Sequence, residues 1–211
     1  MNKKKTYRIS IVIVILFGMS LFYIGTDRFT AFTVESARIH ELKKQQPQFP
    51  EVSLQDSQGR TYPFTEFEDR YVFITFFYTA CTTVCPELER NMGEVYDAIP
   101  SEYMENDITF LSISFDSEHD TPETLAKYRQ YFHSDGETWR MARVIDPDEL
   151  KTLLQSFGVV VIPDGHGHFA HNSAFYLVNK HGHLVDVMDY KKVDEAIHQV
   201  METLTQEREV N

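Results

Sequence analysis

Cysteine is scarce in this chain, since only two of its 211 residues are cysteines, Cys81 and Cys85. Without a second cysteine pair, a zinc site built from several thiolates is disfavoured. No cysteine lies near the apolar segment at residues 9–25, which excludes attachment to lipid by a lipoprotein route. Internal repeats and low-complexity tracts are also absent, and a hydrophobic fraction of 42% is enough for one domain with a real core.

Positive charge is also in short supply. The chain has 20 Lys and Arg residues against 32 Asp and Glu residues, giving a formal net charge of −12. The first 26 residues contain four basic side chains and no acidic one, so the remaining residues carry a net charge of −16. A domain this acidic argues against binding to nucleic acid, whose phosphates attract basic surfaces.

The N-terminal end has the pattern of a membrane anchor. A basic segment at residues 1–8 precedes the uncharged, apolar residues 9–25. This stretch is about 17 residues long, the short end of the range for a transmembrane helix. The positive charges predict a single-pass anchor in the cell membrane with a cytoplasmic N-terminus and an extracytoplasmic globular domain. A cleaved signal peptide is the alternative, although no small-residue cleavage motif follows the segment.

The rest of the chain is predicted to form a tether with helical character at 26–48, a globular domain at 49–205 and a tail at 206–211. The domain should be α/β, with a central mixed sheet flanked by helices and an N-terminal hairpin, in the order of a thioredoxin-like fold. The expected elements are a hairpin at 52–62, strands at 72–77, 108–115, 173–178 and 184–187, and helices at 88–99, 121–132, 146–157 and 193–204.

The two cysteines lie where the predicted strand 72–77 gives way to a helical pattern. A helix N-terminus favours thiolates, so both thiols are expected to be more acidic than a free cysteine. If residues 81–85 are helical, the two Cβ atoms lie about 5–6 Å apart on one face. That separation suits a redox-active disulfide or one soft metal ion. A purely structural disulfide is the alternative, but its five-residue loop would stabilise the fold little.

Nine histidines are present, and His171 differs from the others by position. It lies two residues before the strand 173–178, which is apolar on both faces and is therefore expected to be central. In a thioredoxin-like fold the loop entering that strand packs against the cysteine turn, so His171 is predicted to be a metal ligand. His166 and His168 are predicted to be solvated, or to form a weak auxiliary metal site. The remaining histidines are assigned no special role.

Two thiolates and one imidazole favour copper, and thiolates hold Cu(I) in particular. Three protein ligands leave a coordination position open, through which the metal can be handed on. Oxidation of the same two cysteines to a disulfide would abolish the site, so the redox state would control metal binding.

Three segments together resemble the Sco/SenC family of membrane-tethered copper proteins. They are Cys81-Thr82-Thr83-Val84-Cys85-Pro86, the segment at 114–122, and the segment from His171 to Val178. The resemblance implies a thioredoxin-like copper chaperone that binds Cu(I) or Cu(II) through Cys81, Cys85 and His171. It also implies delivery to the copper-site subunit of cytochrome c oxidase for its dinuclear centre, with a copper donor and a thiol reductant as further partners. Asp116 is implied to support the site from nearby.

Two other functions are left open. A thiol–disulfide oxidoreductase would reduce the copper-ligand cysteines of the oxidase subunit without carrying metal, and the resemblance permits this role as well. A peroxiredoxin-like peroxidase is suggested by Thr82-Thr83-Val84-Cys85, which resembles the Thr-x-x-Cys turn of that family. That family's pattern also has a proline where this chain has Tyr78. Whether the protein is an enzyme therefore stays open, with metallochaperone as the main hypothesis.

Overall fold

The computed structural model describes residues 3–25, 34–104 and 106–210. The chain divides into two compact units, Met1–Lys44 and Gln45–Asn211. The first contains helix α1 (Lys3–Gly25) and nearly all of α2 (Val34–Gln45), which supplies the helix expected in the tether. Residues 1–2, 26–33 and 211 of the predicted basic segment, tether and tail lie outside the described residues.

Within the described part of the chain, no helix has the length and apolar character that crossing a bilayer requires. The membrane anchor at residues 9–25 is therefore not confirmed and stays a prediction.

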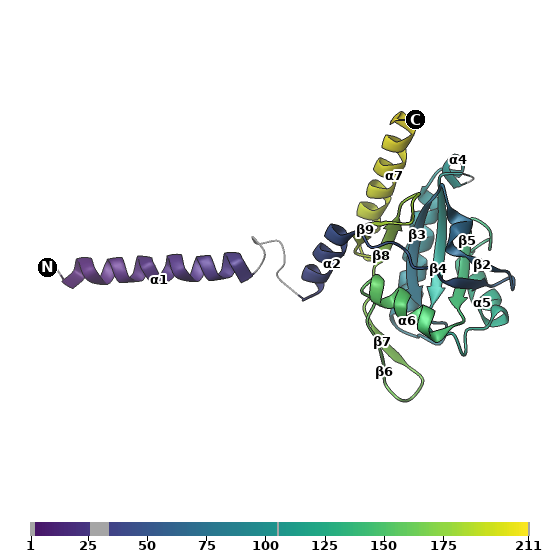
Figure 1. Cartoon of the computed structure of the whole chain (residues 1–211), viewed down its shortest axis with the longest axis horizontal. Helices are drawn as coiled ribbons and strands as arrows, with labels where there is room; N and C mark the ends of the chain where they lie inside the picture. The colour runs from purple at the N-terminus through teal and green to yellow at the C-terminus, as the bar shows by residue number, and fades with distance from the viewer. Residues whose placement is uncertain (1–2, 26–33, 105, 211) are drawn as a thin grey trace. The chain divides into compact units, whose positions relative to one another are not determined.

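The second unit is built on a seven-stranded mixed sheet with the order β2-β1-β5-β4-β3-β8-β9 (Figure 1). The three inner strands β5, β4 and β3 run parallel, while the other neighbours pair antiparallel. A separate antiparallel hairpin is formed by β6 and β7. The strands are β1 (Ser53–Asp56), β2 (Thr61–Pro63), β3 (Tyr71–Phe77), β4 (Ile108–Ser114), β5 (Trp139–Val144), β6 (Val161–Pro163), β7 (Phe169–His171), β8 (Phe175–Val178) and β9 (Leu184–Met188).

Helices connect and cover these strands, and α3 and α7 pack against each other. The predicted central sheet with flanking helices and an N-terminal hairpin, β1–β2, is therefore present. The last helix continues past its predicted end at Leu204. The helices of this unit are α3 (Val84–Ala98), α4 (Ser101–Met104), α5 (Pro122–Tyr128), α6 (Pro147–Ser156) and α7 (Val193–Val210), with short 3₁₀ helices η1 (Phe64–Phe67) and η2 (Arg129–Phe132).

The helices predicted at 121–132 and 146–157 both begin at a capping residue. The Thr121 side chain accepts a hydrogen bond from the backbone N–H of Thr124 at the start of α5. The Asp146 side chain accepts two such bonds at the start of α6. A proline occupies the first turn of each helix, where its missing N–H costs nothing.

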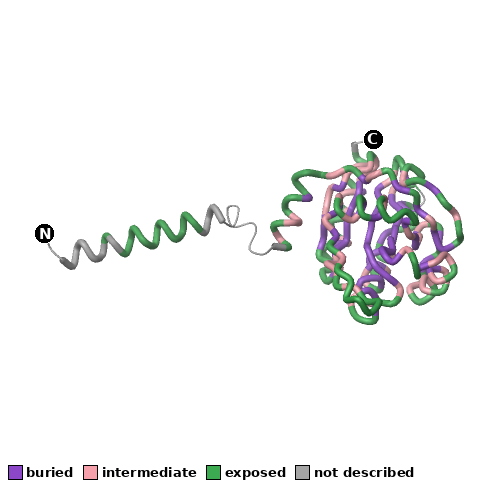
Figure 2. Tube along the Cα trace, turned by 60° about the horizontal axis from the view of Figure 1, so that its bottom comes forward, coloured by how far each residue is buried: buried purple, intermediate pink, exposed green. Residues whose placement is uncertain are grey.

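The core lies around β3 and β4, which are buried along their whole length (Figure 2). Their aromatic side chains pack across the sheet, with ring centroids of Phe73 and Phe110 5.1 Å apart and those of Phe73 and Phe175 5.0 Å apart. Because the three inner strands are parallel, their carboxyl ends meet at one edge of the sheet, and the cysteine turn follows β3 at that edge.

Strand β5 and the β6–β7 hairpin are among the elements that were not predicted from the sequence. Strand β5 occupies an inner position of the sheet although Arg140 and Arg143 interrupt its apolar pattern. The Arg140 guanidinium lies 4.9 Å from the ring centroid of Tyr62, and Arg143 donates a hydrogen bond to the Ser117 carbonyl. The β6–β7 hairpin precedes β8, which pairs with β3 and β9 and so lies second from the sheet edge, not at its centre.

Candidate metal site

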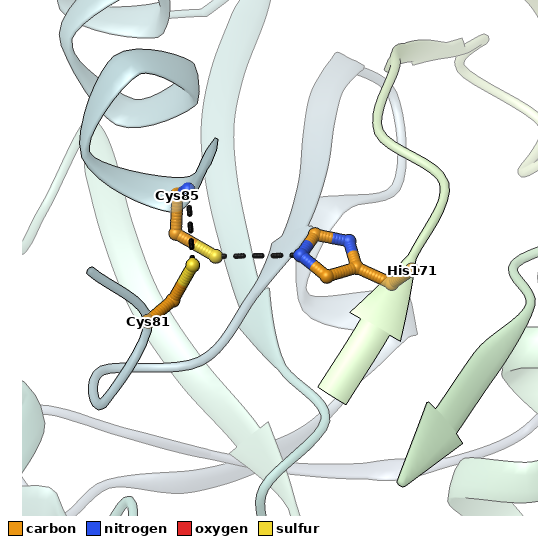
Figure 3. Close-up of side chains that lie close together, drawn as sticks. All are labelled: Cys81, Cys85 and His171. Carbon is orange, nitrogen blue, oxygen red and sulfur yellow. Dashed lines mark hydrogen bonds between the residues drawn. The ribbon is translucent and has the colours of Figure 1, made fainter. Parts of the chain in front are cut away.

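The structure brings together the side chains of Cys81, Cys85 and His171 (Figure 3). They come from the loop after β3, the first turn of α3 and the last residue of β7. Their donor atoms all lie within 4.8 Å of one another. Among the described residues, no other group of three or more His, Cys, Asp or Glu side chains converges in this way.

Helix α3 begins at Val84, so Cys81 lies in the preceding loop and only Cys85 is helical. The condition under which both cysteines would share one helical face, a helix over residues 81–85, is therefore not met. The Cys81 sulfur instead accepts a hydrogen bond from the backbone N–H of Cys85, with 3.3 Å between the two atoms. The N–H groups of the first helical turn are usually bonded by the side chain of the N-cap residue, but Thr83 at the N-cap of α3 makes no such bond. The Cys81 sulfur takes its place as the acceptor for one of these N–H groups.

This arrangement separates the acidities of the two thiols. Burial pushes the pKa of Cys81 upward, but hydrogen bonds from Cys85 and Thr83 outweigh it, so the pKa falls below its ordinary value. Burial dominates at Cys85, which is 0% exposed, and raises the pKa of that thiol strongly. The expectation of two acidic thiols is therefore confirmed for Cys81 and wrong for Cys85.

His171 presents Nε2 to the cysteines, 3.5 Å from the Cys85 sulfur. Its other ring nitrogen, Nδ1, lies 3.1 Å from the backbone oxygen of Asn172 and 3.3 Å from the Ser173 hydroxyl. The Asn172 carbonyl can only accept, so the bond places the proton on Nδ1 and the lone pair on Nε2. Burial lowers the pKa of His171, which favours the neutral ring that a metal requires.

Aromatic rings enclose this imidazole. The ring centroid of His171 lies 5.0 Å from that of Phe115 and 6.2 Å from that of Tyr78. Phe169 contacts both of these rings, and its backbone N–H donates to the Tyr78 hydroxyl. The three aromatic residues belong to segments far apart in the sequence, so no local signal marked them as part of the site. They limit the access of water to the donor atoms.

The loop that carries Cys81 is fixed by Asp120, which sequence reasoning missed. This fully buried carboxylate accepts hydrogen bonds from the backbone N–H and the hydroxyl of Thr79 and from the hydroxyl of Ser114. Asp116, the predicted supporting residue, hydrogen-bonds His119 and is not one of the three converging side chains. Its supporting role therefore stays a prediction.

Replacing Asp120 by alanine is expected to lower the free energy of unfolding by about 3 kcal/mol, because three donors lose their buried acceptor. Chemical denaturation of the metal-free protein measures this loss. Asp120→Asn is the matched control, since its amide oxygen still accepts from Thr79 and the loss should be smaller. Equal stability of the alanine variant and the unmodified protein would show that Asp120 does not brace this loop.

A second buried carboxyl group lies one turn after Cys85 on α3. Glu89 is 0% exposed and accepts a hydrogen bond from the Ser112 hydroxyl at 2.8 Å, while its Oε1 atom has no hydrogen-bond partner among the described residues. Burial raises the pKa of Glu89 to about 8, against the lowering effect of the Ser112 hydrogen bond. At neutral pH the folded protein therefore holds this group mostly protonated.

Glu89 should make the fold less stable as the pH rises. The pKa of Glu89 is higher in the folded state than its ordinary value of 4.5. The stability that the protonated group contributes to the fold is therefore fully present below about pH 4.5 and is lost as the pH rises through about 8. The Glu89→Gln variant, which does not titrate, should gain on the order of 3 kcal/mol relative to the unmodified protein between pH 5 and pH 8. Urea unfolding of both proteins at several pH values measures the difference. A constant difference over this range would contradict the assignment.

His166 and His168 do not join the three donors. Both lie in the exposed turn of the β6–β7 hairpin, five and three residues before His171, respectively. The prediction that they are exposed to solvent is confirmed.

The chain has relatives of known family. Residues 40–206 match the sequence profile of the SCO1/SenC family. The chain is 26% identical over 144 residues to the SCO1 protein homolog of Bacillus subtilis, covering 67% of this chain and 72% of that relative.

Solved structures share the fold, which confirms the thioredoxin-like architecture of the sheet and its helices. The copper-bound ScoI of Bradyrhizobium japonicum has a TM-score of 0.62 and 23% identity, over 74% of this chain and 99% of that chain. BsSco, described as a member of the Sco family of cytochrome c oxidase assembly proteins, has a TM-score of 0.65 and 22% identity, over 76% and 95%. The family profile covers most of the chain, and the chain therefore belongs to the SCO1/SenC family.

Proposed function

We propose that this protein is a copper chaperone that binds copper through the Cys81 and Cys85 sulfurs and the His171 Nε2 atom. It would deliver the metal for assembly of the dinuclear copper site of cytochrome c oxidase, with the copper-site subunit as its partner. The observation that carries the proposal is the convergence of these three donor atoms within 4.8 Å. Two sulfurs and one imidazole nitrogen form a donor set suited to copper.

The surroundings of the donors support transport of the metal better than permanent retention. The imidazole is held neutral with Nε2 free of its proton, and the Cys81 thiol is easily deprotonated. The high pKa of Cys85 means that binding must displace a proton from a buried thiol, so copper affinity should rise with pH. Three protein donors leave a position at which a receiving ligand can attack. Oxidation of the two thiols to a disulfide would release the metal.

Titration of the reduced full-length protein with Cu(II), followed by visible and EPR spectroscopy, tests the proposal. A sulfur-to-copper charge-transfer band should appear at one equivalent of copper and change in the His171→Ala variant. The absence of this band, or a band unaffected by His171→Ala, would count decisively against the proposed ligands. Normal oxidase assembly in cells that carry Cys81→Ser and Cys85→Ser would reject the role in assembly.

A second candidate, a thiol–disulfide oxidoreductase acting on the cysteines of the oxidase subunit, is favoured by the unequal acidities of the two thiols. An acidic thiol next to a buried, poorly acidic one is the arrangement in which one sulfur attacks and the other resolves the mixed disulfide. A peroxiredoxin-like peroxidase is disfavoured, because Cys85 would be the attacking residue and burial raises its pKa.

The unequal acidities predict unequal alkylation. Cys81 should react with iodoacetamide at least about tenfold faster than Cys85 at pH 7, because the thiolate is the reacting species. Mass spectrometry of the reduced, metal-free protein at early times identifies the modified residue. Equal rates at the two positions would contradict the hydrogen-bond pattern and remove the support for the second candidate.

The cellular location is proposed from the sequence. An anchor at residues 9–25 would hold the domain on the extracytoplasmic side of the cell membrane, with residues 1–8 in the cytoplasm. The uncharged stretch and the basic residues before it support this topology. Extraction of membranes at alkaline pH tests it: an anchored chain stays with the membrane fraction, whereas release into the supernatant would contradict the anchor.

A further inference from the structure

The turn of the β6–β7 hairpin, residues 164–168, is called here the hairpin tip. The strands pair from Val161 opposite His171 to Pro163 opposite Phe169. The Asp164 N–H then donates to the His168 carbonyl at 2.9 Å, which closes the turn. The hairpin tip therefore belongs to the same two-stranded element that carries His171.

The conformation of the hairpin tip is well defined. One Asp164 carboxylate oxygen accepts hydrogen bonds from the backbone N–H groups of His166 and His168, at 2.7 and 3.0 Å. These bonds hold the pKa of Asp164 below its usual range, so a negative charge stays at the turn. Gly165 and Gly167 have φ values of +78° and +90°, a region that strongly favours glycine.

The imidazoles of His166 and His168 take no part in the hydrogen bonds that hold the described fold together. Both residues are exposed, the His168 ring interacts electrostatically with the nearby Asp164 carboxylate, and neither ring has a hydrogen-bond partner among the described residues. Other histidine rings do have one: His119 bonds Asp116, and His183 bonds the Gln46 carbonyl. With one glycine between them, the two Cα atoms are at most about 7 Å apart, so both rings can reach a single ion.

We propose that His166 and His168 form a second, weaker copper site at the hairpin tip, which binds Cu(II). Imidazole nitrogen is a favoured ligand of Cu(II). The Asp164 charge attracts a cation to the same turn. Two protein donors leave the remaining positions to water, so the ion is held weakly and exchanges readily.

The role of this site rests on the proposed function. A Cu(II) ion captured at the hairpin tip is held on the same element as His171, close to the central site along the chain. The ion would pass to Cys81, Cys85 and His171 without a change in oxidation state, while the two thiols release their protons to solvent. The hairpin tip thus raises the local supply of copper at the site that delivers it.

Binding at the hairpin tip is tested without the central site. The full-length Cys81→Ser, Cys85→Ser, His171→Ala protein is titrated with copper sulfate and examined by EPR for nitrogen hyperfine coupling. Adding His166→Gln and His168→Gln should weaken Cu(II) binding at least about tenfold and remove the nitrogen coupling. Adding His181→Gln and His198→Gln, two exposed histidines elsewhere, should change neither. Unchanged binding after loss of His166 and His168 would overturn the proposal.

The supply role is tested in the protein with an intact central site. With limiting Cu(II), the sulfur-to-copper band should appear several-fold more slowly in the His166→Gln, His168→Gln protein than in the unmodified protein. An equal rate would overturn the supply role. The two proposals can fail separately. If the unmodified protein shows no charge-transfer band, the proposed function is rejected. If copper still binds at the hairpin tip of the Cys81→Ser, Cys85→Ser, His171→Ala protein, the hairpin-tip site is retained.

Discussion

Replacing Cys85 by serine is expected to lower the affinity for Cu(I) by on the order of 100-fold. A hydroxyl is a hard, poorly ionised ligand, whereas Cu(I) prefers thiolate sulfur. Metal sites of three or four protein ligands gain on the order of 3 kcal/mol from each ligand, which corresponds to about two powers of ten in affinity. Competition with a chromophoric Cu(I) chelator measures the change in the full-length protein.

The loss at Cys85 should be specific to the sulfur. Serine differs from cysteine by one atom, and the residue is completely buried in the first turn of α3, so the packing changes little. Thr82→Ser, an exposed substitution in the same loop, is the matched control and should leave the affinity unchanged. An affinity for Cu(I) within about threefold of the unmodified protein in Cys85→Ser would show that this thiol is not a ligand.

Replacing His171 by alanine is expected to lower the Cu(I) affinity by about 10- to 100-fold and to alter the Cu(II) spectrum. The imidazole is the only nitrogen donor among the three converging side chains, and its Nε2 is already oriented by the bond from Nδ1 to the Asn172 carbonyl. Without it, two thiolates remain, a set that still holds Cu(I) but cannot complete the Cu(II) site. The same chelator competition and a visible spectrum after addition of Cu(II) measure both effects.

His181→Ala is the control for that variant. His181 is exposed in the turn between β8 and β9 and is not part of the converging group. Its loss should leave the affinity and the spectrum unchanged. If His171→Ala behaves like His181→Ala, copper binding depends on the sulfurs alone and the three-donor site is wrong.

Local signals were sufficient for most of the fold. The apolar runs of β3 and β4, the Gly-containing hairpin and the capped starts of α5 and α6 each depend on neighbours a few residues away, which the sequence displays directly. The convergence of Cys81, Cys85 and His171 was also predictable. The cysteines follow a buried strand and precede a helix, and the histidine precedes a later buried strand, so both segments are expected at the same edge of the sheet.

The features that the sequence did not reveal depend on contacts between distant segments. Strand β5 carries two arginines, and only the structure shows that Arg140 lies over Tyr62 and that Arg143 reaches the Ser117 carbonyl. Asp120 was passed over because its importance comes from Thr79, 41 residues earlier in the chain. The acidity of Cys85 was misjudged because the pattern shows a helix start and does not show how deeply the thiol is buried.

X-ray absorption spectroscopy at the copper edge of the Cu(I)-loaded, full-length protein tests the copper site most directly. Two sulfur neighbours and one imidazole nitrogen are expected, and the nitrogen should disappear in His171→Ala. A copper ion surrounded only by nitrogen and oxygen, or a coordination shell unchanged by Cys81→Ser and Cys85→Ser, would contradict the proposal that these three side chains carry the metal.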